Sequence, residues 1–93
     1  MAREPIPTDP GALRERLKQV IIEALMLDLK ADEIEDQAPL FGSGLGLDSV
    51  DALELAVEFE RVFGVRIPDD EASRKVFASV DSLAAFFATQ AEA

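Results

Sequence analysis

The residues best placed for chemistry lie between positions 40 and 60, where a glycine-rich loop leads into a helical pattern. Gly42, Gly44 and Gly46 leave the loop without side chains that would obstruct an approaching molecule. Just after this loop, Ser49 places a hydroxyl group at the predicted start of a helix. A serine at a helix start most often serves only as a cap. The role of Ser49 therefore has to be judged from the residues around it.

The segment after the loop has the pattern of an amphipathic helix. Its apolar residues recur at helical spacing, and neither Pro nor Gly interrupts them before Gly64. We therefore expect a helix that begins at Asp48 or Ser49 and ends near Phe63.

Three acidic residues of this helix should share one narrow strip. Asp51, Glu54 and Glu58 are spaced i, i+3 and i+7, which places them on the same face. The apolar residues cover most of the remaining circumference, so we expect a central helix with one acidic strip in water. The apolar lining of the core is then expected to include Leu53, Ala56, Val57, Ile67, Phe77 and Leu83.

The composition argues against catalysis by this chain. It contains no Cys, which excludes disulfides and thiolate metal sites. It contains no His, which removes the commonest general base and the commonest transition-metal ligand. With no nucleophile–base arrangement visible either, we expect a protein that is not an enzyme.

The charge and hydropathy restrict the partners. The formal net charge is −10, which opposes binding to nucleic acid or to an anionic membrane and favours basic protein partners. No apolar run reaches the length of a membrane span, and the N-terminus lacks the apolar stretch of a signal peptide. We expect a cytoplasmic, free-standing monomer.

The remaining pattern predicts a single all-α domain. Residues 1–8 contain two prolines without periodicity and are expected to form a flexible N-terminal arm, followed by the domain over residues 9–93. Asp9-Pro10 predicts the start of a first helix that ends near Asp28. Asp69 is expected to cap a short third helix, and Ser79 the last helix. These elements predict a small antiparallel bundle of three long helices and one short third helix.

The long connection over residues 29–47 should be held by apolar anchors. It also contains four acidic residues that could bind a metal, but they lack the spacing and the central glycine of an EF-hand. We therefore expect a solvated acidic loop without a metal. The anchors are Ile34, Leu40, Phe41, Leu45 and Leu47, and the acidic residues are Asp32, Glu33, Glu35 and Asp36.

The run GLGLDSVDALEL at residues 44–55 resembles the phosphopantetheine attachment site of acyl carrier proteins, in which Asp-Ser and an aliphatic residue open the second helix. The resemblance extends to PLF at residues 39–41 and to VRIPDDEA at residues 65–72, and it spans roughly residues 13–87. None of the other serines follows this motif.

The resemblance implies that Ser49 carries 4′-phosphopantetheine, transferred from coenzyme A by a phosphopantetheinyl transferase with magnesium. The terminal thiol of the group would hold acyl chains as thioesters. This explains how a chain without Cys or His can serve acyl chemistry, since the reactive sulfur belongs to the cofactor. It further implies that an acyl chain can enter between the second, third and fourth helices.

The resemblance also assigns a partner-binding surface to the second helix. Asp48, Val50, Asp51, Glu54 and Glu58 are the residues expected to contact partners. The partners implied are the transferase and enzymes with basic docking surfaces, such as acyl-transferring and ketosynthase-type enzymes. Attraction between opposite charges suits a carrier that must dissociate after each step.

Several alternatives remain open at this point. Val50 after the serine, and Arg61 and Arg66 near the end of the second helix, differ from bulk fatty-acid carriers, so a fatty-acid and a specialised polyketide or lipid pathway are equally compatible. Asp48 argues mildly against a peptidyl or aminoacyl carrier. A different class is an acidic helical interaction module that is never modified and binds a basic partner.

Overall fold

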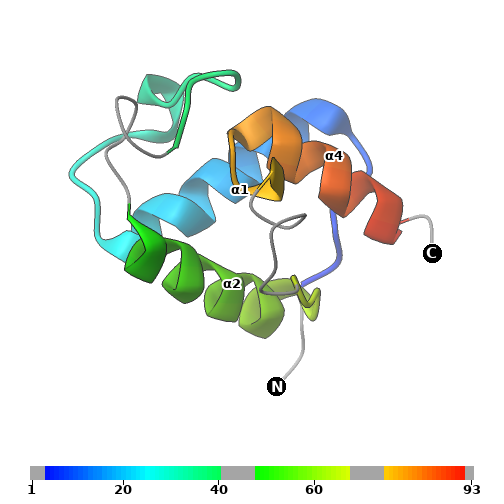
Figure 1. Ribbon diagram of the computed structural model, residues 1–93. Helices are drawn as coiled ribbons and strands as arrows, with labels where there is room; N and C mark the ends of the chain where they lie inside the picture. The colour runs from blue at the N-terminus through cyan, green and yellow to red at the C-terminus, as the bar shows by residue number, and fades with distance from the viewer. Residues whose placement is uncertain (1–3, 41–47, 68–74, 92–93) are drawn as a thin grey trace.

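The computed structural model describes residues 4–40, 48–67 and 75–91, and in these residues the regular structure is entirely helical. α1 spans Pro10–Leu25, a short 3-10 helix η1 spans Ala31–Glu33, α2 spans Ser49–Phe63 and α4 spans Val80–Ala91. α1 and α2 run in opposite directions side by side, and α4 lies across the other flank of α1 (Figure 1). The all-α bundle predicted from the sequence is confirmed.

α1 begins where the sequence indicated and packs against both other long helices. The Asp9 side chain accepts a hydrogen bond from the Ala12 amide at 2.9 Å, and Pro10 occupies the first turn, where its missing N–H is not needed. The buried face of α1 consists of Leu13, Leu17, Val20 and Ile21. α1, rather than α2 as predicted, is therefore the central helix.

The end of α1 differs from the prediction. The helix stops at Leu25 instead of near Asp28, because Met26 adopts the left-handed conformation with φ 52°. The Leu27 amide then donates to the Ile22 carbonyl at 3.0 Å, the bond that closes a Schellman turn. Because Met26 is not a glycine, no residue type at this position indicates that the helix ends here.

α2 ends as predicted and presents one strongly buried face. Gly64 has φ 74° and donates its amide to the Glu60 carbonyl at 2.8 Å, which terminates the helix. Leu55, Phe59 and Phe63 recur every four residues and are all buried. This face points into the bundle.

Phenylalanine rings connect α2 to α4. Phe87 of α4 makes edge contacts with Phe59 and with Phe63, with ring centroids 5.2 Å and 5.4 Å apart. Phe59 also stacks on Phe77 at 6.5 Å. Such aromatic pairs contribute about 0.5–1.5 kcal/mol beyond the burial of their area. The rings therefore hold α4 and the C-terminal half of α2 to one core.

Ser79 caps α4 as predicted, by accepting a hydrogen bond from the Ser82 amide at 3.2 Å. Lys75 and Val76 are helical, while the rest of the predicted third helix, residues 69–74, lies outside the described residues. Of the core residues predicted from the sequence, Ile67, Phe77 and Leu83 are buried and Ala56 is partly buried.

Leu53 and Val57 were wrongly assigned to the core. Their exposed fractions are 60% and 59%. The helices next to α2 contact the face that carries Leu55 and Phe59. Leu53 and Val57 each lie two positions from Leu55, so their side chains point to a different side of the helix. Helical spacing alone does not show how much of the apolar surface the neighbours cover.

Two of the predicted anchors hold the connection between α1 and α2. Ile34 and Leu40 are buried, with exposed fractions of 3% and 0%. The Leu40 amide donates to the Ala78 carbonyl at 3.0 Å, which joins the connection to the turn before α4. Phe41, Leu45 and Leu47 lie outside the described residues.

Ionic contacts tie the same connection to α1 and α4. Asp36 is only partly exposed, unlike the other acidic residues of the connection, and Lys18 Nζ lies 2.7 Å from its Oδ1. Arg14 Nε donates to Asp81 Oδ1 at 2.8 Å and lies 3.9 Å from Asp36 Oδ2. The expectation that all four acidic residues of the connection lie in solvent is therefore wrong for Asp36.

Residues 4–8 run along the end of the bundle (Figure 1). The Glu4 amide donates to the Val62 carbonyl at 2.7 Å, and the Glu4 carboxylate pairs with Arg16 through contacts of 2.5 Å and 3.0 Å. Ile6 packs partly buried against the core. The flexible arm over residues 1–8, with its boundary to a domain over residues 9–93, stays a prediction.

The left-handed Met26 predicts a stabilising substitution. Met26→Gly should raise the free energy of unfolding by about 0.5–1 kcal/mol, because glycine adopts this conformation without steric cost and Met26 is 89% exposed. Urea unfolding measures the change. Met26→Ala is the control, since it keeps the strain and removes the same side chain. An equal gain from alanine would show that backbone strain is not the cause.

The Glu4–Arg16 pair predicts a pH-dependent contribution. The hydrogen bond from Arg16 lowers the pKa of Glu4, so the stabilisation is present above the ordinary value of 4.5 and is lost as the pH falls through the lowered pKa. Glu4→Gln should destabilise by at most about 1 kcal/mol at pH 7, as for other exposed pairs, and this difference should shrink as the pH falls below 4.5. Urea unfolding at low salt, with Glu15→Gln as the control, tests this. A difference between wild type and Glu4→Gln that does not shrink as the pH is lowered from 4.5 would contradict it.

Candidate functional site

Two reciprocal hydrogen bonds define the start of α2. Asp48 Oδ1 accepts from the Asp51 amide, and Asp51 Oδ2 accepts from the Asp48 amide, both at 3.0 Å. This is a capping box built from two aspartates. The carboxylates lie at the positive end of the helix dipole, which favours negative charge. The cap fixes where α2 begins.

Ser49 is the first helical residue of α2, directly after the Asp48 cap. The first backbone hydrogen bond of the helix runs from the Ala52 amide to the Asp48 carbonyl at 3.1 Å. The amides of Ser49 and Val50 precede it and have no acceptor within the helix. The backbone at this position therefore offers N–H groups suited to a phosphate group attached nearby.

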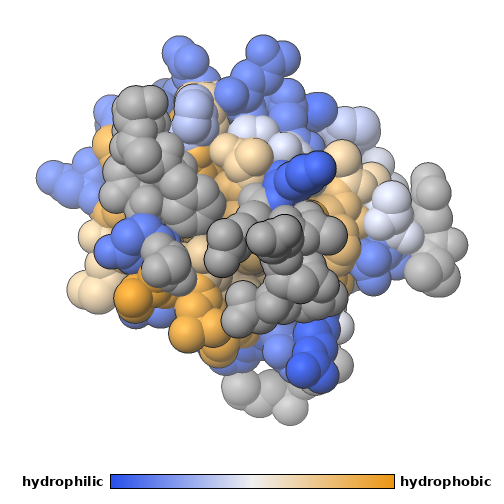
Figure 2. All heavy atoms as spheres, in the orientation of Figure 1, coloured by the Kyte–Doolittle hydropathy of each residue, from blue (hydrophilic) through white to orange (hydrophobic). Residues whose placement is uncertain are grey.

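Exposed apolar side chains follow the serine along α2. Val50 has an exposed fraction of 61%, and Leu53 and Val57 lie at the next positions of the same face, spaced i, i+3 and i+7. Figure 2 shows apolar surface over this part of α2. An apolar stripe of this kind beside a candidate attachment point is suited to contact with another protein.

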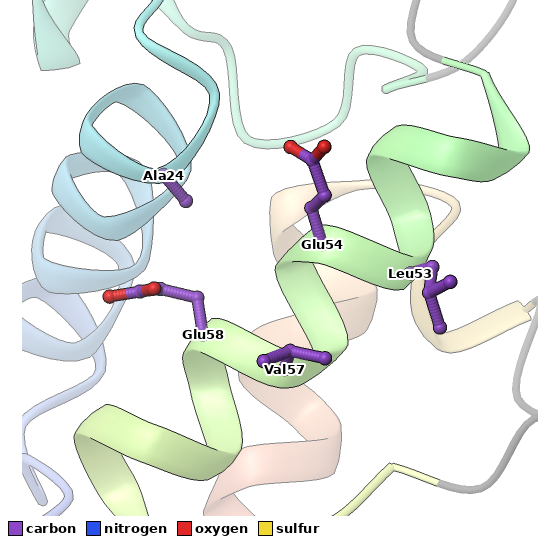
Figure 3. A pocket seen from close by; sticks show the side chains of 5 residues that line it. All are labelled: Ala24, Leu53, Glu54, Val57 and Glu58. Atoms are coloured by element: carbon purple, nitrogen blue, oxygen red, sulfur yellow. The ribbon is translucent and has the colours of Figure 1, made fainter.

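Acidic side chains border this stripe. Glu54 is exposed, and Glu58 and Asp51 are partly exposed. In Figure 3, Glu58 points from α2 toward α1, where Ala24 lies, whereas Leu53 points away from α1. The predicted acidic strip therefore lies on one side of α2, with Glu54 exposed and with Asp51 and Glu58 partly exposed at its two ends.

A shallow hollow of about 380 Å³ lies between the acidic and the apolar side chains (Figure 3). Its volume is near the lower end of the roughly 300–1,000 Å³ range of ligand sites, and it is open to solvent. It suits a side chain of a docked protein better than an enclosed small molecule. Its lining residues are Ala24, Leu53, Glu54, Val57 and Glu58.

Arg61 contacts the acidic strip from the next turn. Its Nη2 donates to Glu58 Oε1, and its Nε donates to Glu58 Oε2 at 3.4 Å. This hydrogen bond with Glu58 raises the pKa of Arg61. Arg61 also lies in the last turn of α2, where a positive charge is favourable to the helix dipole.

The sequence pattern placed the predicted site residues on α2 but did not predict two contacts that they make, the one between Asp48 and Asp51 and the one between Glu58 and Arg61. Asp51 was predicted only as a partner-binding residue, although its spacing of three from Asp48 is that of a capping box. Arg61 was interpreted only as a difference from bulk fatty-acid carriers, although its spacing of three from Glu58 allows the observed pair. Both signals were present in the sequence.

The fold and this helix start define a small, acidic, all-α domain with a serine at the first position of an acid-capped helix. Comparison with protein-family models matches residues 15–87 to the family described as the phosphopantetheine attachment site. The match covers most of the chain and includes the whole of α2, so the protein belongs to this family of carriers.

Membership of the family gives the class of cofactor and activity. The domain is one to which 4′-phosphopantetheine is attached covalently, and its members carry the group rather than catalyse a reaction. Carriers of this kind are served by a phosphopantetheinyl transferase and by partner enzymes. No helix in the described ranges is both long and apolar enough to cross a membrane.

The capping box predicts a local effect of Asp48. Asp48→Ala should destabilise by about 1 kcal/mol, because the Asp51 amide loses its acceptor. Hydrogen exchange at the Asp51 amide should then be faster than in wild type. Asp48→Asn keeps an acceptor oxygen and should retain most of the protection. If both variants lose the protection of the Asp51 amide equally, the stabilisation comes from the charge of the Asp48 carboxylate.

Proposed function

We propose that this protein is an acyl carrier whose 4′-phosphopantetheine is attached to the Ser49 hydroxyl. The observation that carries the proposal is the position of Ser49 as the first residue of α2, next to the Asp48 cap and inside the region matched by the family. The thiol of the attached group would hold acyl intermediates as thioesters and move them between enzymes.

The start of α2 supports attachment by its charge and geometry. A phosphodiester at Ser49 would add an anion where the helix dipole is positive and where the first amides lack helical acceptors. The carboxylates of Asp48 and Asp51 are already engaged with each other's amides. The protein contributes the acceptor hydroxyl and this environment, while the transferase supplies the catalysis.

The α2 surface supports a role in docking partner enzymes. We propose Asp48, Val50, Asp51 and Glu54 as the direct contacts, and the acidic residues among them complement a basic surface. Glu58, the fifth residue of the surface predicted from the sequence, is paired with Arg61. The exposed Val50 would provide an apolar contact close to the attachment point. Attraction of this kind speeds encounter without requiring tight binding.

The cargo is proposed to be an acyl group of fatty-acid, polyketide or related lipid biosynthesis, in the cytoplasm and on a monomeric carrier. Aspartate before the serine favours this cargo over a peptidyl or aminoacyl group. Leu53 and Val57 are exposed, so an acyl chain that enters the bundle would contact the buried Leu55 or Phe59 rather than a lining formed by those two residues.

Loading of the cofactor tests the attachment site. The protein is incubated with coenzyme A, magnesium and a broad-specificity phosphopantetheinyl transferase, and its intact mass is measured. Wild type should gain one phosphopantetheine group and Ser49→Ala none. Ser79→Ala is the matched control, because Ser79 also lies at a helix start and caps α4.

Two results would contradict the proposal. A folded wild-type protein that gains no mass would favour the unmodified acidic interaction module. A gain that is kept in Ser49→Ala but lost in another serine variant would assign the cofactor to a different residue.

A further inference from the structure

The acidic residues of α2 do not have equal access to a partner. Glu54 is exposed at the rim of the hollow, whereas the side chain of Glu58 has an exposed fraction of 23%. Arg61 covers Glu58 from the next turn and is itself 61% exposed. A basic side chain that approaches Glu58 from solvent therefore meets a positive charge.

Arg61 already provides the contacts that a partner would offer. Its guanidinium donates to both carboxylate oxygens of Glu58. This is the forked arrangement by which arginine binds carboxylates. A cation of a partner would have to displace Arg61 from Glu58. Its net gain in binding free energy would then be only the difference between two similar ion pairs.

Glu54 and Glu58 lie at different distances from Ser49, so the pairing of Glu58 with Arg61 changes which part of α2 is negatively charged. At 1.5 Å per residue, Glu54 lies about 8 Å from Ser49 along the axis and Glu58 about 14 Å. If Glu58 is neutralised, the negative charge of the strip formed by Asp51, Glu54 and Glu58 is confined to the first two turns of α2, beside the attachment point.

We propose that Arg61 neutralises Glu58 and thereby limits recognition of α2 by negative charge to Asp48, Asp51 and Glu54. This inference rests on the proposed carrier function and deepens it. Arg61 acts here as a specificity-determining residue: a partner whose basic groups extend to the third turn of α2 is disfavoured, and a partner with a compact basic patch at its active-site entrance is favoured.

A double-mutant cycle tests the pairing in the complete chain. The measured quantity is kcat/KM of a broad-specificity phosphopantetheinyl transferase, with the unmodified protein as substrate, at low ionic strength. The variants are Glu58→Gln, Arg61→Gln and the double variant. Glu54→Gln is the positive control, and Glu60→Gln controls for the loss of one exposed charge from the same helix. Urea unfolding verifies that each variant is folded.

The proposal predicts that the effect of Glu58 depends on Arg61. The double variant, which removes both charges of the pair, should keep kcat/KM within the change caused by Glu60→Gln, whereas Glu54→Gln should lower it by about two- to fivefold, as expected for an exposed charge pair. In the Arg61→Gln background, Glu58→Gln should lower kcat/KM by a similar factor. Arg61→Gln alone should raise kcat/KM.

Other outcomes overturn the proposal. If the double variant is loaded as slowly as Glu54→Gln, partners use Glu58 despite Arg61. If Glu58→Gln has no effect in either background, Arg61 does not restrict recognition. If wild type is not loaded at all, the carrier function itself fails, and this result differs from either of the other two.

Discussion

The reciprocal hydrogen bonds between Asp48 and Asp51 are the constraint on which the functional surface depends. They set the residue at which the helical backbone of α2 begins, so Ser49 is its first helical residue. With the helix starting at Ser49, Leu55 and Phe59 face the core. The exposed stripe that begins at Val50 then lies on the outside. A change in the start of α2 would alter the environment of the candidate serine.

The charges of the protein fall into two groups with different roles. Several basic residues pair with acidic ones away from the start of α2, as Arg16 does with Glu4 and Lys18 with Asp36. These pairs connect the N-terminal segment and the long connection to α1, each with a modest contribution to stability. The acidic residues of the first two turns of α2 are not used in this way, apart from the aspartates of the cap.

The helix starts, the end of α2 and the candidate serine could be predicted because each depends on a few neighbouring residues. Asp9-Pro10, Ser79 and Gly64 have local meanings that hold in most proteins. The end of α1 could not be predicted in this way, since Met26 adopts a conformation that favours glycine. The exposure of Leu53 depends on how neighbouring helices pack, and the contact of Glu4 with Val62 joins residues far apart in sequence. Periodicity contains neither kind of information.

A thiol count tests the carrier account most directly, because the chain contains no Cys and therefore no thiol of its own. The protein is treated with coenzyme A, magnesium and a phosphopantetheinyl transferase, separated from free coenzyme A, and titrated with a thiol reagent. The account predicts no thiol before treatment, one per chain afterwards, and none on the Ser49→Ala variant. A folded wild-type protein that remains without a thiol, or a Ser49→Ala variant that acquires one, would contradict it.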